Sequence, residues 1–287
     1  ELYSDAAVKA EQAGKTELRK PEDFVELPSE SETLNSISTS GFVNLSRKKG
    51  GMTGTALSVT KYFRKFYNMS VLEVPVESGL QTLSMRIKFK AEEAMHAVGK
   101  QLLDNSNNKV PTLLGVKNPA KVETYARFLT ENKYAEYFDL GQFAEDLKRK
   151  NLTEIQIESM INQEFDKLSK KAAAQEKPVI ITLYSKNQEL EDYVVRYAGR
   201  PGIVVLTTGI LGRGINMTLG GDTGYMKRFV EEKILSAKEY DQMIKERKQE
   251  QQAIDQAGGL FVLRTFVGKS IRDDEQFDKR AGRAKGP

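Results

Sequence analysis

The sequence lacks cysteine entirely and contains a single histidine, His96, among its 287 residues. Without cysteine the chain can form no disulfide scaffold, thiol nucleophile or cysteine-bound zinc site. A single histidine excludes metal sites built from several histidines, and a serine–histidine–aspartate triad would depend on His96 alone. Because His96 lies in an expected helix beside Met95 and Val98, we expect it to be a structural or surface residue.

Long apolar runs and a strong charge of one sign are also missing. The longest apolar runs, such as Ile203–Leu206, fall far short of the roughly 18 residues that a membrane-spanning helix needs. The 44 basic and 40 acidic residues leave a net charge of +4, which requires neither a nucleic acid nor an anionic membrane as partner. With 39% hydrophobic and 29% charged residues, the composition is typical of a globular rather than a disordered or fibrous protein.

Short apolar segments alternate with amphipathic helical segments through most of the chain after residue 110. This alternation predicts strand–helix–strand units and a parallel sheet covered by helices on both faces. In such sheets ligands bind in the loops after the carboxyl ends of the strands, which here follow Val116, Tyr184, Thr208 and Thr265. The expected strands are 111–116, 178–184, 202–208 and 260–265, and the expected helices are 120–132, 188–198 and 236–256.

A longer helical stretch at about 141–175 predicts a helical hairpin. Thr153 with Gln156 three residues later fits a capping box that opens the second helix, and an apolar stripe follows it. We expect this hairpin to protrude from the sheet or to pack on it. The remaining expected elements are a short helix at 3–12, a helical segment at 57–67 and a buried strand at Val71–Pro75.

One arginine stands between two glycines directly after the strand expected at 202–208. Gly212 and Gly214 let the backbone around Arg213 approach a charged ligand and leave the guanidinium free to swing. An arginine presented in this way can neutralise the charge that develops on a transferring phosphoryl group. A glycine-rich turn with a surface arginine fits the same pattern.

Two further segments are candidates for chemistry. Arg280 and Arg283 are three residues apart, so on one helical turn they point the same way and suit a polyphosphate. A solvated basic face, paired with the nearby acids Asp273, Asp274, Glu275 and Asp278, fits equally well. The run GMTGTA at 51–56 places small hydroxyl residues between glycines, which suits an interaction loop or a tight turn.

These segments, in this order, resemble the SecA family, the motor ATPase of bacterial protein export, over most of the chain. The run at 51–56 is identical to the family's GMTGTA, and residues 198–202 are similar to its AGRPG. Residues 212–214 and 219–221 match its GRGTDIxLGG. The other similarities are 3–11 with YSDGLHQAIEAKE, 32–38 with QTLASIT, 63–68 with FRKIYN, 258–260 with GGL and 280–283 with RAGR.

The resemblance implies a RecA-like fold of the P-loop NTPase and superfamily 2 helicase type, which is an α/β parallel sheet flanked by helices. The added helical hairpin at about 141–175 has no counterpart in the usual family pattern. The resemblance also implies three parts. Residues 1–33 form an amino-terminal connecting segment, 34–84 the end of a first RecA-like lobe and a linker, and 85–287 a second RecA-like lobe. We therefore expect the chain to be part of a longer protein.

Family members bind ATP between two such lobes, and the resemblance implies site residues in the second. Arg213 is the expected arginine finger, and Arg280 and Arg283 are the expected phosphate sensors. The other implied residues are Gly212, Gly214 and Asn216 for nucleotide binding and Thr53, Gly54 and Thr55 for coupling nucleotide state to lobe movement. ATP and Mg²⁺ are expected only with the missing first lobe, and no metal site is expected in this chain.

The phosphate-binding motif Gly-x-x-x-x-Gly-Lys-Ser/Thr is absent from the sequence. Residues 13–16 (AGKT) look like its end, but Lys9 stands where the motif requires its first glycine, and no apolar strand leads in. A two-lobe ATPase cannot hydrolyse ATP without groups that bind phosphate and magnesium. We therefore expect this chain alone to be inactive, whatever the full-length protein does.

The implied function is part of an ATP-driven protein-translocation motor. The expected partners are the missing P-loop lobe, a polypeptide substrate, a membrane translocon and an unknown protein at the hairpin, and the expected location is cytoplasmic with peripheral membrane association. A nucleic-acid helicase lobe shares the fold. The mild charge and the lack of a strongly basic stripe disfavour it, so we expect no nucleic-acid partner.

Two departures from the family pattern favour an alternative function. The family's Thr-Asp after Gly-Arg-Gly is Ile215-Asn216 here, and asparagine cannot accept two charge-assisted hydrogen bonds as aspartate does. Asp278 stands where the family has an arginine two residues before Arg280. The alternative is a protein-interaction module that kept the fold and lost ATPase activity.

Overall fold

The structure is a computed structural model that describes residues 36–53, 56–74, 87, 89–185, 188–208, 217–268 and 271–278. The chain divides into two compact units, residues 1–50 and 51–287. The described part of the first unit contains helix α2 (Thr39–Asn44), which begins where the Ser38 hydroxyl accepts a hydrogen bond from the Gly41 amide at 3.1 Å. The helix expected at 3–12 lies outside the described residues.

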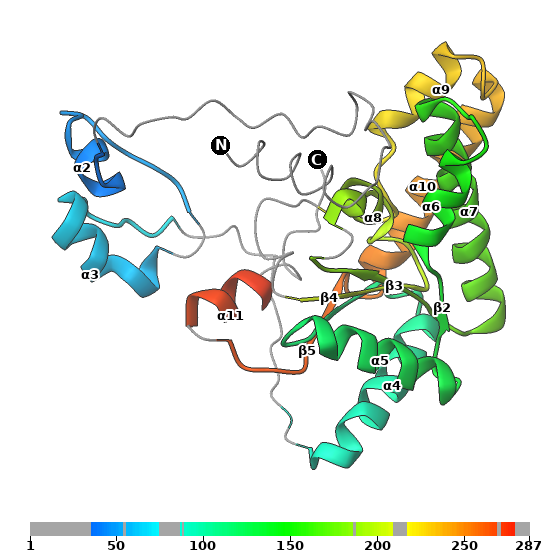
Figure 1. Cartoon of the computed structure of the whole chain (residues 1–287), viewed down its shortest axis with the longest axis horizontal. Helices are drawn as coiled ribbons and strands as arrows, with labels where there is room; N and C mark the ends of the chain where they lie inside the picture. Colours follow the sequence, from blue (N-terminus) through cyan, green and yellow to red (C-terminus); the bar gives the residue numbers. More distant parts are fainter. Residues whose placement is uncertain are drawn as a thin grey trace, which may run out of the picture. The chain divides into compact units, whose positions relative to one another are not determined.

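A parallel sheet of five strands forms the centre of the described part of the second unit (Figure 1). The strand order is β2-β3-β4-β1-β5, and every pair of neighbours is parallel. The four strands expected from apolar runs are confirmed, and every residue of β1, β3 and β4 is buried. The strands are β1 (Thr112–Gly115), β2 (Glu136–Tyr137), β3 (Val179–Leu183), β4 (Ile203–Thr207) and β5 (Phe261–Arg264).

Helices cover both faces of the sheet, as the alternating pattern predicts (Figure 1). The main helices are α4 (Ala91–Asn107), α5 (Pro119–Glu131), α6 (Leu140–Lys148), α7 (Glu154–Gln175), α8 (Glu191–Tyr197), α9 (Lys227–Glu231) and α10 (Ala237–Gln256), with short 3-10 turns η4 (Gln188–Leu190) and η6 (Gly224–Met226). On one face, Leu102 of α4 and Leu129 of α5 are fully buried against Leu114 of β1. On the other face, α6 to α10 form a buried cluster that includes the neighbouring residue Leu113. Adjacent residues of β1 thus face opposite cores, as the pleat of a strand requires.

Helices α6 and α7 form the expected hairpin, and the hairpin packs on the sheet. The capping box at the start of α7 is confirmed. The Thr153 hydroxyl accepts from the Gln156 amide at 3.3 Å, and the Thr153 amide donates to Gln156 Oε1 at 3.0 Å. The inner face of α7 buries Ile161 and Phe165, and the Phe165 ring stacks on Tyr197 with centroids 4.0 Å apart. This face of the hairpin is therefore part of the domain core.

Residues 56–74 are helical at first and irregular afterwards. The expected helical segment is confirmed as three consecutive pieces, the 3-10 turn η2 (Leu57–Val59), α3 (Thr60–Tyr62) and the π-helical turn η3 (Phe63–Tyr67). The buried strand expected at Val71–Pro75 is wrong, because residues 71–74 form no strand and the Leu72 and Val74 side chains are 87% and 78% exposed. An apolar run forms a strand only where a neighbouring strand pairs with its backbone. No described strand pairs with residues 71–74.

Candidate functional site

The carboxyl ends of three strands lie level with one another at one edge of the sheet. Gly115 at the end of β1 is in register with Thr207 of β4 and with Arg264 of β5. The Val116 amide donates to the Thr207 carbonyl at 2.8 Å, and the Thr265 hydroxyl donates to the Gly115 carbonyl at 3.2 Å. The loops expected to carry chemistry after β1, β4 and β5 therefore leave the sheet side by side.

Thr208 directly follows β4 and opens the loop that carries the expected arginine finger. Its side chain is buried, and its Oγ1 has no hydrogen-bond partner among the described residues. An unsatisfied buried hydroxyl is costly, so Thr208 Oγ1 is a polar group at the base of the loop that a further partner would stabilise. The expected residues Gly212, Arg213, Gly214 and Asn216 lie outside the described residues.

The chain leaves that loop at Met217 and is immediately fixed to the turn after α8. The Gly220 amide donates to the Gly199 carbonyl at 2.9 Å. A Cβ on Gly199 would collide with the Thr218 carbonyl oxygen, and Gly220 has a φ of +78°, which other residues rarely adopt. The two glycine motifs at 198–202 and 219–221 therefore pack against each other and hold the exit of the loop in place.

Helix α11 (Ile271–Asp278) precedes the two arginines that are expected to sense phosphate. Its buried Phe277 ring lies against Gly115 and occupies the space that a Cβ at Gly115 would need. The helix is thereby packed on the carboxyl edge of the sheet, on the end of β1. Arg280 and Arg283 follow α11 in the sequence and lie outside the described residues.

Arg264, the last residue of β5, binds two carboxylates of α11. It forms an ion pair with Asp274, and its Nη2 lies 3.1 Å from Asp278 Oδ2. Asp274 is buried and also accepts a hydrogen bond from the Gly268 amide at 2.6 Å. One alternative from the sequence is that these acids pair with Arg280 and Arg283. In the structure Asp274 and Asp278 bind Arg264. Sequence reasoning missed Arg264, although its place at the end of an apolar strand is a signal that points to it.

The Asp274 carboxylate should hold α11 more strongly than the Asp278 carboxylate does. Asp274→Ala would leave the Gly268 amide without this partner and Arg264 without one of its two carboxylates, a loss of about 1–3 kcal/mol or roughly 5- to 150-fold in an opening equilibrium. Asp278 is half-exposed, so we expect Asp278→Ala to change the same equilibrium by less than about fivefold. Hydrogen exchange of the α11 amides measures both variants, and equal acceleration in the two would contradict this ranking.

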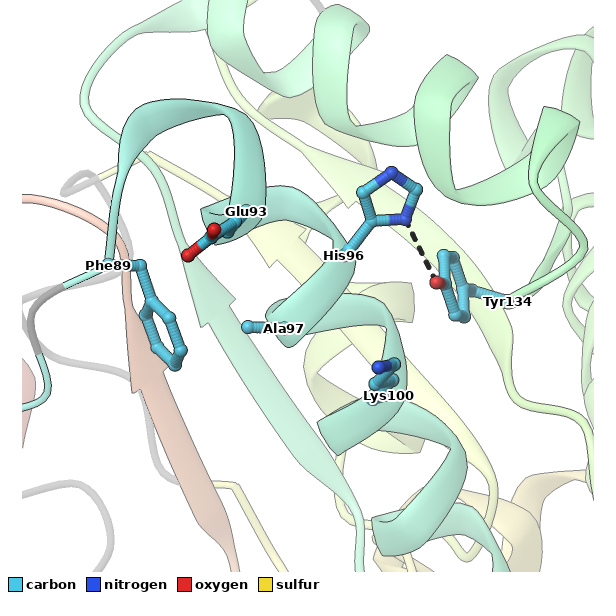
Figure 2. A pocket seen from close by; sticks show the side chains of 6 residues that line it. All are labelled: Phe89, Glu93, His96, Ala97, Lys100 and Tyr134. Carbon is cyan, nitrogen blue, oxygen red and sulfur yellow. Dashed lines mark hydrogen bonds between the residues drawn. The ribbon is translucent and has the colours of Figure 1, made fainter.

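The single histidine lies beside a surface hollow on α4 (Figure 2). The hollow has a volume of about 530 Å³ and is lined by Phe89, Glu93, His96, Ala97, Lys100 and Tyr134. In Figure 2 the His96 ring faces Tyr134, with Nδ1 3.0 Å from the Tyr134 hydroxyl. The ring also packs edge-on against Phe128, with centroids 4.9 Å apart. The His96 side chain is exposed, which confirms the surface alternative of the expected structural or surface position.

Of the residues expected to couple nucleotide state to lobe movement, the structure describes one. Thr53 is exposed, and Gly54 and Thr55 lie outside the described residues. In the part of the chain that the structure describes, no three histidine or acidic side chains come together as metal ligands. Among the same residues, no helix has both the length and the apolarity needed to cross a membrane.

Comparison with known proteins agrees with this architecture, which is that of an α/β domain of the P-loop type. A family model described as the SecA P-loop domain matches residues 85–287. The protein translocase subunit SecA of Bartonella tribocorum is 27% identical over 271 residues, which cover 92% of this chain and 25% of that protein. The SecA subunit of Ehrlichia ruminantium is 26% identical over 265 residues, which cover 90% of this chain and 25% of the relative.

The chain belongs to the SecA family, because the family model covers most of its length. It is a divergent member at this level of identity. It spans about a quarter of the length of the curated relatives it matches.

Proposed function

We propose that this chain is the second RecA-like lobe, together with the end of the first, of a SecA-like ATP-driven protein-translocation motor. Support comes from relatives named as translocase subunits, which match 90% or more of the chain. The observation that carries the proposal is the carboxyl edge of the sheet. The loop at 209–216 leaves this edge at Thr208 and is fixed again at Gly220, and α11 packs on the same edge before Arg280.

On this proposal Arg213 is the arginine finger of an ATP site between two lobes, and Arg280 and Arg283 contact the phosphates. A guanidinium is always charged and presents its donors in a planar fork, so it can neutralise charge that develops on the transferred phosphoryl group. Gly212 and Gly214 allow the backbone to approach the nucleotide closely. Asn216 contacts the nucleotide less strongly than the family's aspartate would.

The first lobe would supply the P-loop and the magnesium ligands, because the motif is absent from these 287 residues. On this proposal the magnesium ligands come from the first lobe and none from this chain. Thr53, Gly54 and Thr55 would couple the nucleotide state to movement of the lobes.

The proposed partners follow from the same family. They are the first lobe, a polypeptide substrate, a membrane translocon and a protein that contacts the outer face of the hairpin. A motor with these partners works on the cytoplasmic side of the membrane and associates with it peripherally.

A second candidate function is a protein-interaction module without ATPase activity. The observation that favours it is Asp278, which brings a negative charge to the position where the family pattern has an arginine. Its carboxylate lies 3.1 Å from Arg264 Nη2, so that charge is partly neutralised within the chain. This pairing reduces the weight of Asp278 as evidence against phosphate binding nearby.

ATP turnover by the full-length protein tests the proposal. We expect measurable turnover from the full-length protein and none from this chain alone, because no P-loop is present in its sequence. Phosphate release by the full-length protein and by this chain is measured under identical conditions. Micromolar ATP binding by the full-length protein supports the motor. The absence of both ATP binding and ATP turnover supports the interaction module instead.

A further inference from the structure

The hollow on the exposed face of α4 lies between two aromatic walls (Figure 2). In Figure 2 the Phe89 ring lies on one side of Ala97, and His96 and Tyr134 lie on the other. The Phe89 side chain is 50% exposed, so it is open to contact from outside. The small side chain of Ala97 leaves room between the walls for an apolar group. A volume of about 530 Å³ is within the range of ligand pockets, roughly 300–1,000 Å³.

A glycine in the middle of α4 builds one of these walls. Gly99 is buried, and a Cβ at this position would collide with the Tyr134 ring. Glycine is less favourable than alanine in a helix interior, so the chain carries a destabilising residue where the ring approaches the helix backbone. The Tyr134 hydroxyl in turn lies 3.0 Å from His96 Nδ1, and the His96 ring packs against Phe128. This wall of the hollow is therefore already in place before a partner binds.

Two opposite charges line the hollow on either side of Ala97 along the helix. Glu93 and Lys100 are exposed and stand seven residues apart on α4, which separates them by about 10 Å along the helix axis. In the part of the chain that the structure describes, neither side chain forms an ion pair or a hydrogen bond. A molecule that fills the hollow therefore meets a negative charge at one end and a positive charge at the other.

The shape of the hollow favours a peptide over a small ligand. Pockets for small ligands bury most of the ligand surface, but Glu93, His96 and Lys100 in the lining are all exposed. In an extended peptide, alternate side chains point to the same side and lie about 7 Å apart. The pattern basic-x-apolar-x-acidic therefore presents its apolar side chain to Ala97 and its two charges to Glu93 and Lys100.

We propose that the hollow on α4 binds an extended segment of a protein partner with the pattern basic-x-apolar-x-acidic. The apolar side chain supplies most of the affinity, because exposed ion pairs contribute little, and the two charges set the direction of the segment. This inference goes beyond the proposed motor function. The hollow lies on a helix that covers one face of the sheet, and its binding requires neither ATP nor the first lobe.

Peptide titrations of this 287-residue chain test the proposal. His96 is the single histidine of the sequence, so its imidazole resonances in an NMR spectrum report on this hollow alone. We expect the capped peptide Lys-Ser-Phe-Ser-Asp to shift these resonances in a saturable way. Lys-Ser-Ser-Ser-Asp lacks the apolar side chain and should bind at least about tenfold more weakly. No saturable shift with the first peptide, or equal affinity for the two, overturns the proposal.

Two alanine substitutions locate the binding. Ala97→Leu fills the space between the walls with a residue that helices accept well, and it should weaken Lys-Ser-Phe-Ser-Asp at least about tenfold. Ala173→Leu is the matched control, because Ala173 is exposed on α7, away from the lining of the hollow. It should leave the affinity unchanged. An equal loss of affinity in the two variants overturns the proposal.

A charge reversal tests the recognition and does not depend on whether Ala97→Leu folds. Glu93→Lys should bind Lys-Ser-Phe-Ser-Asp about two- to fivefold more weakly and Asp-Ser-Phe-Ser-Asp more tightly than the unchanged chain does. If both affinities stay the same, the charges do not select the partner and the pattern is wrong. N-acetylphenylalanine amide tests the alternative of a small aromatic ligand, and its binding as tightly as the pentapeptide would overturn the peptide proposal. None of these measurements uses ATP turnover, so their failure would leave the proposed motor function untouched.

Discussion

Replacing Arg213 by alanine is expected to lower ATP turnover by the full-length protein by about 10³- to 10⁵-fold. The loss arises because the guanidinium neutralises charge that develops only in the transition state, so ATP affinity should change far less than kcat. Arg213→Lys keeps the charge but not the planar fork, and we expect it to restore only a small part of the rate. Steady-state phosphate release at saturating ATP measures kcat for the wild type, Arg213→Ala and Arg213→Lys.

A matched control for that experiment is Arg149→Ala. The Arg149 side chain is 71% exposed, and its ion pairs with described residues are those with Glu145 and Asp146 of the preceding helix, so its loss should leave turnover unchanged. If Arg213→Ala retains full turnover, Arg213 is not the finger, and the glycine-rich segment around it is an ordinary surface turn.

The largest effect on stability is expected at Arg200. Arg200→Ala would remove a fully buried guanidinium and leave the partly buried carboxylates of Asp166 and Glu250 short of a partner, and breaking an ion cluster in this way costs up to about 3–5 kcal/mol. For a domain of this size each kcal/mol lowers the melting temperature by roughly 2–4 °C, so we expect a fall of about 6–20 °C. Calorimetry or circular dichroism on this chain measures it.

The exposed pair at Arg149 again provides the comparison. Arg149→Ala should cost less than about 1 kcal/mol, because exposed ion pairs contribute little. A similar fall for the two variants would mean that the Arg200 cluster is hydrated and weak. A fall confined to Arg200→Ala would establish that the cluster is held by the fold and that its carboxylates depend on that guanidinium.

Local patterns in the sequence predicted most of this fold. The central strands could be predicted because each is a short apolar run, as expected for a strand that helices cover on both faces of the sheet. The start of α7 was predicted because a capping box is a contact between residues only three apart, Thr153 and Gln156. The prediction of a strand at 71–75 is wrong because a strand needs a neighbouring strand to pair with, and a short run of residues does not reveal whether one is present.

The sequence predicted only those parts of the candidate site that form short local motifs. Glycines around Arg213 and the spacing of Arg280 and Arg283 mark candidates in a linear reading, and whether they act together stays a prediction. The charge cluster at Arg200 was not found, because Asp166 lies 34 residues before it and Glu250 lies 50 residues after it. No short motif records such a pairing, and only the packing of α7 against α10 brings the groups together.

The position of β1 has a consequence for how the protein is made. This strand lies between β4 and β5, yet the contact between Thr265 and Gly115 joins residues 150 apart in the chain. At roughly 5–20 residues per second, about 8–30 s of synthesis separate the two strands. Until β5 arrives, Leu113 and Leu114 sit on an open edge to which a strand of another chain can add. In the completed domain the half-buried strand β5 takes the place of the fully buried β1 at that end of the sheet, so the nascent chain exposes a more apolar edge than the finished one.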